Sequence, residues 1–331
     1  MSAARYDVVG LGNAIVDVIA RAEEDFLVGH GMHKGGMALI DEARAEAIYA
    51  QMGPAVEISG GSAANTIAGV ASYGARAAFV GKVKDDGLGR VFAHDIRAAG
   101  VAFTTPSAAA GPSTGRCYIL VTPDGERTMN TYLGAAQHLA PADVDAEVIA
   151  ASAITYLEGY LWDPHNAKAA FRRAAALAHG AGRRVALSLS DAFCVDRWRD
   201  EFRALVRGGT VDVLFANEAE LKSLYQTADF ASAAAALRRE ARLAVVTRGE
   251  NGCMVVSPSG LEPVSAFPVE RVVDTTGAGD LFAAGFLVGL ARGRDHATAA
   301  RLGALAAAEV IGHLGARPET SLKVLAGQHG L

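Results

Sequence analysis

The sequence is poor in the features that mark disulfide-rich, zinc-binding and nucleic-acid-binding proteins. It has three cysteines among 331 residues, at positions 117, 194 and 253, and none belongs to a CxxC pair. An odd number of distant cysteines supplies neither a disulfide framework nor a zinc site. The formal net charge is −5, so we expect no strongly basic face and no nucleic acid as a partner.

Long hydrophobic runs are also missing. The best run, residues 281–291, is too short for a membrane helix and is flanked by Asp280 and Arg292. Residues 1–7 lack the apolar core of a signal peptide. We therefore expect a cytoplasmic protein that does not engage a membrane.

Aromatic residues make up only 7% of a chain that is 51% hydrophobic. Alanine supplies much of the hydrophobic fraction, in runs such as 233–236 and 306–308, and alanine favours helix. A chain of 331 residues is long enough to bury a large core. The composition suits one large α/β domain with an accessory element, or two domains.

Short apolar runs alternate with helical patterns through most of the chain. The runs that resemble buried strands are residues 6–10, 77–81, 153–157, 185–189, 211–215 and 243–247, and the helical segments include 62–73, 87–99, 278–292 and 295–314. Strands separated by ten or more helical residues are typical of a mostly parallel sheet covered by helices. The pattern predicts an α/β fold.

Two regions interrupt this alternation. Residues 14–41 contain β-rich runs at 16–20 and 37–40, and residues 103–132 contain two more on either side of a Pro-Asp-Gly-Glu turn at 123–126. Such a turn favours a hairpin. We expect both regions to pair into a small β-sheet that forms a lid on a single domain spanning residues 1–331.

The sharpest motif is Asp-Thr-Thr-Gly-Ala-Gly-Asp at 274–280, which leads directly into an apolar helix. The free N–H groups and the dipole at the start of a helix favour an anion. Gly277 and Gly279 allow a phosphate to approach the backbone closely. Asp280 is then placed to accept a proton from a hydroxyl that attacks a phosphoryl group. The alternative is that Asp280 only caps the helix.

The common nucleotide-binding motifs are absent. The Gly81-Lys82 pair lacks the earlier glycine of GxxxxGK[ST], and Gly10-Leu11-Gly12 is followed by Ile15 where the dinucleotide motif needs a third glycine. A nicotinamide-dependent dehydrogenase is therefore disfavoured. Phosphate binding must come from another design.

Two segments together carry a family resemblance. Residues 274–280 resemble the C-terminal signature of the ribokinase-like (PfkB) family of sugar and nucleoside kinases, and residues 60–65 with 81–89 resemble its N-terminal signature. Within that family the sequence is most similar to adenosine kinases, through residues 10–13 with Asp17, Arg127 with 133–136, 158–160 and 187–190. The resemblance implies a three-layer α/β/α domain with a small β-sheet lid. It also implies ATP-dependent phosphorylation of the 5′-hydroxyl of a nucleoside, adenosine to AMP.

The resemblance gives roles to residues on the phosphoryl side of the site. Asp280 would be the catalytic base, and Gly277, Ala278 and Gly279 would form an anion hole for the transferred phosphoryl group. Arg127 would swing over that group when the lid closes. The alternative for Arg127 is an exposed lid arginine in a surface ion pair.

The nucleotide and metal ligands are implied in the same way. The residues that resemble the family's nucleotide site are Asn217, Glu220, Thr247, Gly249 and Gly252. Glu220 would hold the water shell of Mg²⁺, whereas Asn217 alternatively only caps a helix. Asp274 and Thr276 resemble ligands of a monovalent cation, K⁺.

The acceptor side carries hydroxyl-binding and apolar candidates. Asn13, Asp17, Gly61, Ser62 and Asn65 lie where the family places hydroxyl contacts and a lid hinge; a carboxylate suits vicinal ribose hydroxyls. Walls for a purine would come from Ile15, Met37, Met129, Tyr160 and Leu161. The alternatives are a turn at 60–61, a helix start at Asn65 and simple lid packing by the apolar residues.

Two departures from the adenosine kinase pattern leave the substrate open. Asp191 stands where adenosine kinases usually have Ala-Pro, and Ala64 replaces a longer polar residue. Both would suit another ribosyl substrate, such as inosine, guanosine or ribose. The main alternative is a PfkB sugar kinase for ribose, fructose or 2-keto-3-deoxygluconate, and the oligomeric state is a monomer or a homodimer formed through the lid.

Overall fold

The computed structural model describes residues 4–331; residues 1–3, at the start of the segment without a signal-peptide core, lie outside this range. A nine-stranded sheet forms the body, in the order β14-β13-β12-β11-β10-β9-β1-β5-β6. Its strands are β1 (Tyr6–Leu11), β5 (Ala77–Val80), β6 (Val101–Phe103), β9 (Ser152–Glu158), β10 (Arg184–Ser188), β11 (Val213–Asn217), β12 (Ala244–Thr247), β13 (Cys253–Ser257) and β14 (Gly260–Val264). Seven of them, from β12 to β6, run parallel, and β13 and β14 add an antiparallel edge.

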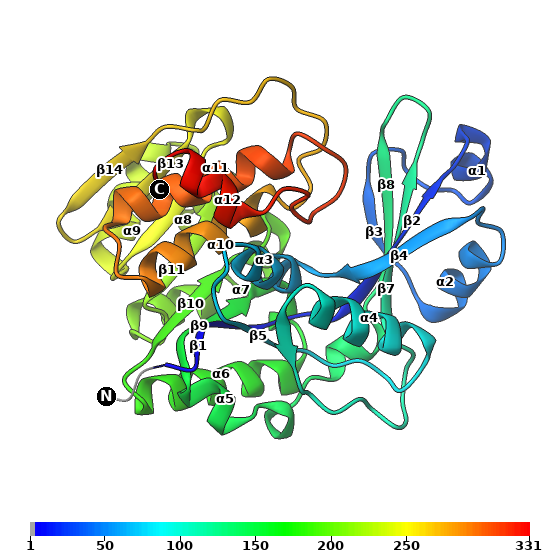
Figure 1. Ribbon diagram of the computed structural model, residues 1–331, viewed down its shortest axis with the longest axis horizontal. Helices are drawn as coiled ribbons and strands as arrows, with labels where there is room; N and C mark the ends of the chain where they lie inside the picture. Colours follow the sequence, from blue (N-terminus) through cyan, green and yellow to red (C-terminus); the bar gives the residue numbers. More distant parts are fainter. Residues whose placement is uncertain (1–3) are drawn as a thin grey trace.

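Helices cover both faces of this sheet (Figure 1). One face packs against α3 (Ser62–Ser72), α4 (Gly87–Ala98), α10 (Ala278–Ala291), α11 (His296–Val310) and α12 (Leu322–Gln328). The other packs against α5 (Ala146–Ala150), α6 (His165–Gly180), α7 (Ala192–Arg207), α8 (Glu218–Tyr225) and α9 (Phe230–Glu240). Alternate residues of one strand enter the two cores, Val8 the first and Val9 the second, as the side-chain alternation of a strand requires. The predicted three-layer α/β/α arrangement with a mostly parallel sheet is confirmed.

Small residues set the spacing of α10 and α11. A side-chain carbon added at Gly285 would lie 2.5 Å from the backbone of Leu302, and one at Gly289 would lie 2.6 Å from Ala299. The glycine and alanine content therefore serves close helix packing, because bulkier side chains would force the two helices apart.

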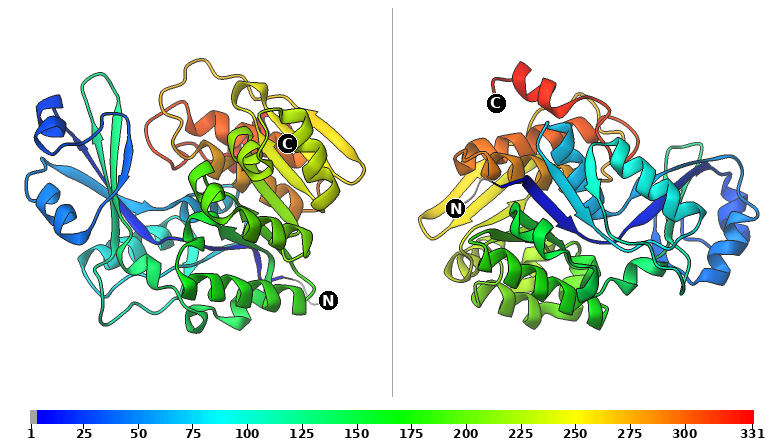
Figure 2. Two further views of the ribbon diagram at one scale, coloured as in Figure 1. Left: turned by 180° about the vertical axis from the view of Figure 1, so that it is seen from behind. Right: turned by 60° about the horizontal axis from the view of Figure 1, so that its bottom comes forward.

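A second sheet of five strands stands beside the body, as both views in Figure 2 show. Its order is β3-β8-β7-β2-β4, with β2 (Ile15–Arg21), β3 (Met37–Leu39), β4 (Ala55–Gly60), β7 (Gly115–Val121) and β8 (Arg127–Tyr132). The helices α1 (Glu24–Gly29) and α2 (Glu42–Tyr49) accompany it. We call this second sheet, with its two helices, the small sheet.

The boundaries predicted for the small sheet need correction. The predicted first segment, 14–41, ends too early, because β4 pairs antiparallel with β2 over six residues. In β4, Val56 and Ile58 alternate with Glu57 and Ser59, which is the pattern of a half-buried strand, but this run lies outside both predicted segments. The predicted second segment, 103–132, begins inside β6, which belongs to the large sheet.

Candidate active site

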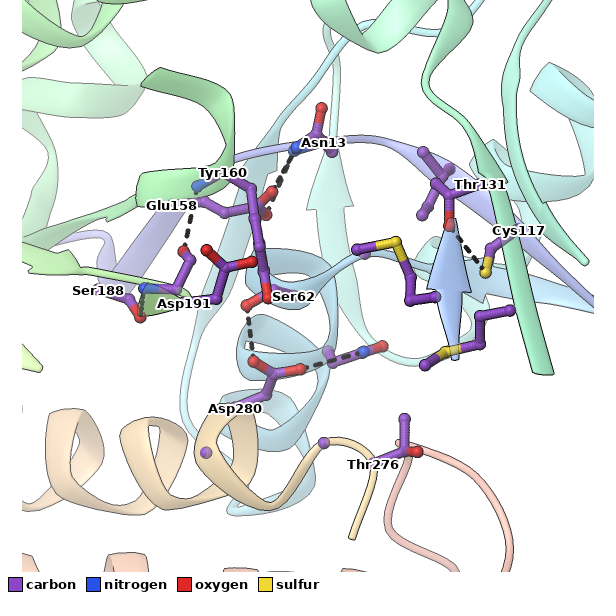
Figure 3. Close-up of a pocket in the computed structure, with 18 of the residues that line it drawn as sticks. Asn13, Ser62, Cys117, Thr131, Glu158, Tyr160, Ser188, Asp191, Thr276 and Asp280 are labelled. Atoms are coloured by element: carbon purple, nitrogen blue, oxygen red, sulfur yellow. Dashed lines mark hydrogen bonds between the residues drawn. The ribbon is translucent and has the colours of Figure 1, made fainter. Parts of the chain in front are cut away.

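A cavity of about 710 Å³ lies between the small sheet and the carboxyl ends of the parallel strands (Figure 3). The last residues of four neighbouring strands line it: Glu158 of β9, Ser188 of β10, Asn217 of β11 and Thr247 of β12. Ligands of α/β sheets bind at this edge, and the volume is that of a small-molecule site.

The N-terminus of α10 closes one side of the cavity. Gly277 precedes the helix with φ +79°, a left-handed conformation that favours glycine, and a Cβ there would lie 2.8 Å from Ala316. Thr276, Gly277 and Gly279 line the cavity, whereas Ala278 does not. The Ala278 N–H donates to the Thr275 carbonyl. The N–H groups of Gly277, Gly279 and Asp280 have no partner within residues 4–331, so they are available to an anion.

Asp280 lies in the first turn of α10 and faces α3. Its Oδ1 accepts a hydrogen bond from the Ser62 hydroxyl at 2.6 Å, and its Oδ2 accepts one from Asn65 Nδ2 at 3.3 Å (Figure 3). Burial raises the pKa of Asp280, and the two hydrogen bonds oppose that rise. The carboxylate is thus oriented by two donors and made more basic by its surroundings, as a proton acceptor requires.

Asp17, on β2, lines the same cavity. Burial and the negative charge of Asp280 raise its pKa to about 7, against the lowering effect of Arg317 and Arg127. Gly60, on the neighbouring strand β4, leaves the space that the carboxyl group needs, because a Cβ there would lie 2.3 Å from it. An ionisable group held in a cleft in this way is a candidate ligand contact.

Glu158 is a site residue for which the sequence suggested no role. Its carboxylate accepts hydrogen bonds from the backbone N–H groups of Asn13 (3.3 Å) and Ala63 (2.8 Å) and from Asn13 Nδ2 (2.5 Å). Burial raises its pKa to about 7. Glu158 therefore joins the end of β9, the entry to the small sheet and the start of α3. Glu158 directly follows the predicted strand 153–157, and this position at the carboxyl end of a strand could have marked it as a site residue.

One face of the small sheet supplies an apolar wall. Ile15, Met37 and Met129 line the cavity as predicted, together with Leu39, Cys117, Ile119 and Leu133. The strand register places Asp17, Cys117, Thr131 and Leu39 in one row across four strands. The wall thus begins at a carboxylate and becomes mainly apolar across the sheet.

Predicted acceptor-side residues reach the cavity with one exception. Asn13, Gly61, Ser62, Asn65 and Tyr160 line it. The prediction for Leu161 is wrong, because the 3-10 turn η3 (Gly159–Trp162) directs its side chain into the core between β9 and α6, where it is fully buried.

The predicted nucleotide residues divide into two groups. Asn217, Glu220 and Thr247 line the cavity; Asn217 also caps α8, accepting from the Glu220 N–H at 2.8 Å. Gly249 and Gly252 do not line the cavity, and their predicted contact with the nucleotide stays a prediction. Gly252 instead serves the turn into β13, where its φ is +75° and a Cβ would lie 2.1 Å from the Val264 carbonyl.

The acidic residues near the nucleotide side fit an indirect magnesium site. Burial and the nearby Asp191 raise the pKa of Glu220 to about 7, so its negative charge would be favoured by a cation. Within residues 4–331 no group of three His, Cys, Asp or Glu side chains is arranged to hold a metal. A bound Mg²⁺ would therefore take most of its ligands from water and nucleotide phosphates, with Glu220 in the outer shell.

Arg127 begins β8 and reaches from the small sheet to the loop before α10. Its Nη1 lies 2.7 Å from Asp274 Oδ2, and the two side chains are 8% and 7% exposed. The distance is that of an ion pair, although the N–H groups at Nη1 and Nε are not aligned on any acceptor in the described chain. The alternative of an exposed surface pair is therefore wrong. Neither Arg127 nor Asp274 lines the cavity itself.

A second arginine near the site, Arg317, was missed by the sequence analysis. Its Nη2 donates to the carbonyl and the hydroxyl of Ser59 on β4, at 2.7 and 2.9 Å. Its charge lies near both Asp17 and Asp280 and lowers the pKa of each. It follows α11 in a loop without regular periodicity, so no sequence pattern marks it.

The fold and the cavity define a small-molecule kinase of the ribokinase type. The profile described as pfkB family carbohydrate kinase matches residues 39–322, and the chain belongs to that family. Kinases of this family use ATP as phosphate donor. Within residues 4–331 no helix has the length and apolar character needed to span a membrane.

Individual solved structures and curated proteins that resemble this chain are kinases of nucleosides or sugars. The crystal structure of adenosine kinase from Sinorhizobium meliloti is 55% identical, covers 98% of this chain and 100% of that one, and superposes with a TM-score of 0.91. A probable sugar kinase from Rhizobium etli is 51% identical over 99% of both chains, with a TM-score of 0.92. Among curated proteins, adenosine kinase of Saccharomyces cerevisiae is 26% identical over 93% of this chain and 95% of its own. The ATP-dependent ribose-1-phosphate kinase of Halopiger xanaduensis is 32% identical over 69% of this chain and 72% of its own. The chain is a nucleoside or sugar kinase.

Proposed function

We propose that this protein transfers the γ-phosphoryl group of ATP to the 5′-hydroxyl of adenosine, giving AMP and ADP. The observation that carries the proposal is the single cavity that combines Asp280 at the head of α10, Asp17 on β2 and an apolar wall. The 55% identity to adenosine kinase of Sinorhizobium meliloti, over nearly the full length of both chains, supports it.

Asp280 acts as the base. The acceptor hydroxyl gives its proton to the carboxylate while its oxygen attacks the γ-phosphorus and the bond to the β-phosphate oxygen breaks. Ser62 and Asn65 hold the carboxylate in place. Ala278 lies between the free N–H groups of Gly277, Gly279 and Asp280, and this turn of α10 stabilises the charge on the phosphoryl oxygens.

Asp17 binds the vicinal ribose hydroxyls. A carboxylate accepts two hydrogen bonds at once. Burial disfavours the ionised form of Asp17, and two hydroxyl donors stabilise that form. Asn13, Gly61 and Asn65 lie around the same end of the cavity. Gly61, with φ +102°, joins β4 to α3 and serves as a hinge for the small sheet, which closes as a lid.

The purine lies against the apolar face of the small sheet. Ile15, Met37 and Met129 lie on that face, and Tyr160 lines the cavity from the end of β9. A planar base buries apolar surface there, whereas a bare sugar would place its hydroxyl groups against this wall without hydrogen-bond partners. This distribution favours a nucleoside over ribose or fructose.

ATP lies on the side of the cavity formed by Asn217, Glu220 and Thr247. When bound, Mg²⁺ neutralises part of the charge on the nucleotide phosphates. Glu220 holds water molecules of that ion, and the exposed ring of Phe193, which lines the cavity, offers a surface for the adenine of ATP.

An ATP-consumption screen tests the substrate. Adenosine, inosine, guanosine, ribose, fructose and 2-keto-3-deoxygluconate are each supplied with ATP and Mg²⁺, and ADP formation is measured. We expect adenosine to give the highest kcat/KM. The sugars are included because the chain is 51% identical to a probable sugar kinase. A higher kcat/KM for any other compound than for adenosine would contradict the proposed substrate.

We also propose that the protein works in the cytoplasm. All three cysteines are buried and unpaired, which suits a reducing compartment. A monomer is the simplest assembly, and the edge strands β3 and β4 of the small sheet would be the pairing surface of a dimer. Light scattering coupled to size exclusion distinguishes the two.

A further inference from the structure

The loop that leads into α10 is fixed by one carboxylate. Asp274 Oδ1 accepts hydrogen bonds from Thr276 N (3.0 Å) and Thr276 Oγ1 (2.7 Å). Its Oδ2 accepts from Gly315 N at 2.9 Å and contacts Arg127 Nη1 at 2.7 Å. Asp274 thus ties the start of the anion hole to the loop after α11 and to the small sheet.

These contacts leave no place for a monovalent cation on Asp274. A carboxylate has about four lone-pair positions, and hydrogen bonds from Thr276 and Gly315 take three of them. The Arg127 guanidinium, with Nη1 at 2.7 Å from Oδ2, places a positive charge where a cation would stand. The Thr276 hydroxyl donates a hydrogen bond to Asp274. The residues that resemble a K⁺ site therefore do not fit K⁺ in this arrangement.

The charge that a cation would bring is already present. The Arg127 guanidinium supplies a positive charge, and its ion pair with Asp274 is nearly sealed from water. A buried pair of this kind is strongly disrupted when one partner is removed, because the other charge is left without compensation.

We propose that the Arg127 guanidinium replaces the monovalent cation beside the anion hole, so that the protein functions without K⁺. Because Arg127 belongs to β8, the small sheet delivers this charge, and the loop before α10 is fully ordered only when the sheet lies against the body. Arg127 acts through Asp274 and is a positioning residue. Its effect on turnover rests on the proposed kinase mechanism. Whether Arg127 or a cation lies against Asp274 does not depend on that mechanism.

The thermal midpoint in different salts tests the proposal without substrate. Wild type and Arg127→Met are melted in rising KCl, with choline chloride holding the ionic strength constant. We expect the wild-type Tm to be the same in both salts. Arg127→Met leaves Asp274 free for a cation, so its Tm should rise saturably with K⁺, by about 2 °C at ten times Kd.

Three variants control the result. Arg116→Met removes another buried arginine of the small sheet, bound to Tyr118 and Ser113, and should show no response to K⁺. Arg127→Met combined with Asp274→Asn should lose the response. Arg127→Lys keeps a positive charge, should fold where the methionine variant does not, and should remain insensitive to K⁺.

Either of two results would overturn the proposal. A saturable, K⁺-specific rise of the wild-type Tm would show that the ion binds beside Arg127. A flat response of folded Arg127→Met, or a K⁺ response of Arg127→Lys, would show that the guanidinium does not hold the place of a cation. The substrate screen fails or succeeds independently of these melts, so the two proposals can be told apart.

Discussion

Asp280 carries the chemistry at the scale of single residues. The motif at 274–280 predicted its position, but the sequence did not show that Ser62 and Asn65 would both donate to it. These contacts come from α3, more than 200 residues away in the chain, and only the packing of α3 on α10 creates them. The capping alternative leaves such donors unexplained.

Replacing Asp280 with Asn should separate binding from turnover. Asn keeps the shape and accepts hydrogen bonds but takes up no proton, so we expect kcat to fall at least about a hundredfold. Adenosine affinity, measured by calorimetry, should change by less than about threefold. Near-normal kcat would remove Asp280 from the role of base.

Removing the Asp17 carboxylate should weaken the binding of only those ligands that carry the ribose 2′- and 3′-hydroxyl groups. We expect Asp17→Ala to weaken binding of adenosine by roughly ten- to a hundredfold, because each hydrogen bond to a charged group is worth about 1.5–3 kcal/mol. Binding of 2′,3′-dideoxyadenosine should change little. Equal losses for the two ligands, measured by calorimetry, would show that Asp17 does not contact the hydroxyls.

The same carboxyl should make stability depend on pH. Folding raises the pKa of Asp17 from 3.8 to about 7, so between these values the folded state binds more protons than the unfolded state. The contribution of Asp17 to wild-type stability is then fully present below pH 4 and is lost as the pH rises towards 7.

Asp17→Asn lacks this titration. Relative to wild type, its free energy of unfolding should improve by about 3 kcal/mol between pH 4 and pH 7 in the absence of ligands. Urea unfolding at several pH values measures the difference. A difference that stays constant with pH would contradict the raised pKa.

At the scale of elements, regular periodicity decided what the sequence could predict. Buried parallel strands such as β9 and β10 are continuous apolar runs, and they lie within two residues of their predicted positions. β4 lies outside both predicted segments although its apolar and polar residues alternate as in a half-buried strand, and it pairs antiparallel with β2. Leu161 was misplaced because a one-turn 3-10 helix sets its direction.

The helix pair α10 and α11 gives a stability prediction. Gly285→Ala adds a Cβ that would meet the backbone of Leu302 at 2.5 Å, so we expect a loss of roughly 1–3 kcal/mol despite the better helix propensity of alanine. Gly180→Ala, near the end of α6, meets nothing within 4 Å and should be neutral or slightly stabilising. Urea unfolding of both variants should show a clearly lower free energy of unfolding for Gly285→Ala than for Gly180→Ala. Equal stabilities would contradict the close packing.

At the scale of the whole molecule, the site exists only because two sheets meet. The family signatures marked residues on each side, yet the order Asp17, Cys117, Thr131 and Leu39 across the small sheet follows from strand register. The contacts of Arg127 with Asp274 and of Arg317 with Ser59 also join the small sheet to the body. Long-range side-chain pairs of this kind have no local signal in a single sequence.

The most direct test of phosphoryl transfer to the 5′-hydroxyl of adenosine is ³¹P NMR of the product. The protein is incubated with adenosine, ATP and Mg²⁺, and the spectrum is compared with those of 5′-AMP, 3′-AMP and ribose phosphates. We expect 5′-AMP and ADP in equal amounts, formed at least about a hundredfold more slowly by the Asp280→Asn variant. A spectrum without 5′-AMP, under conditions in which ribose or fructose is phosphorylated, would contradict it.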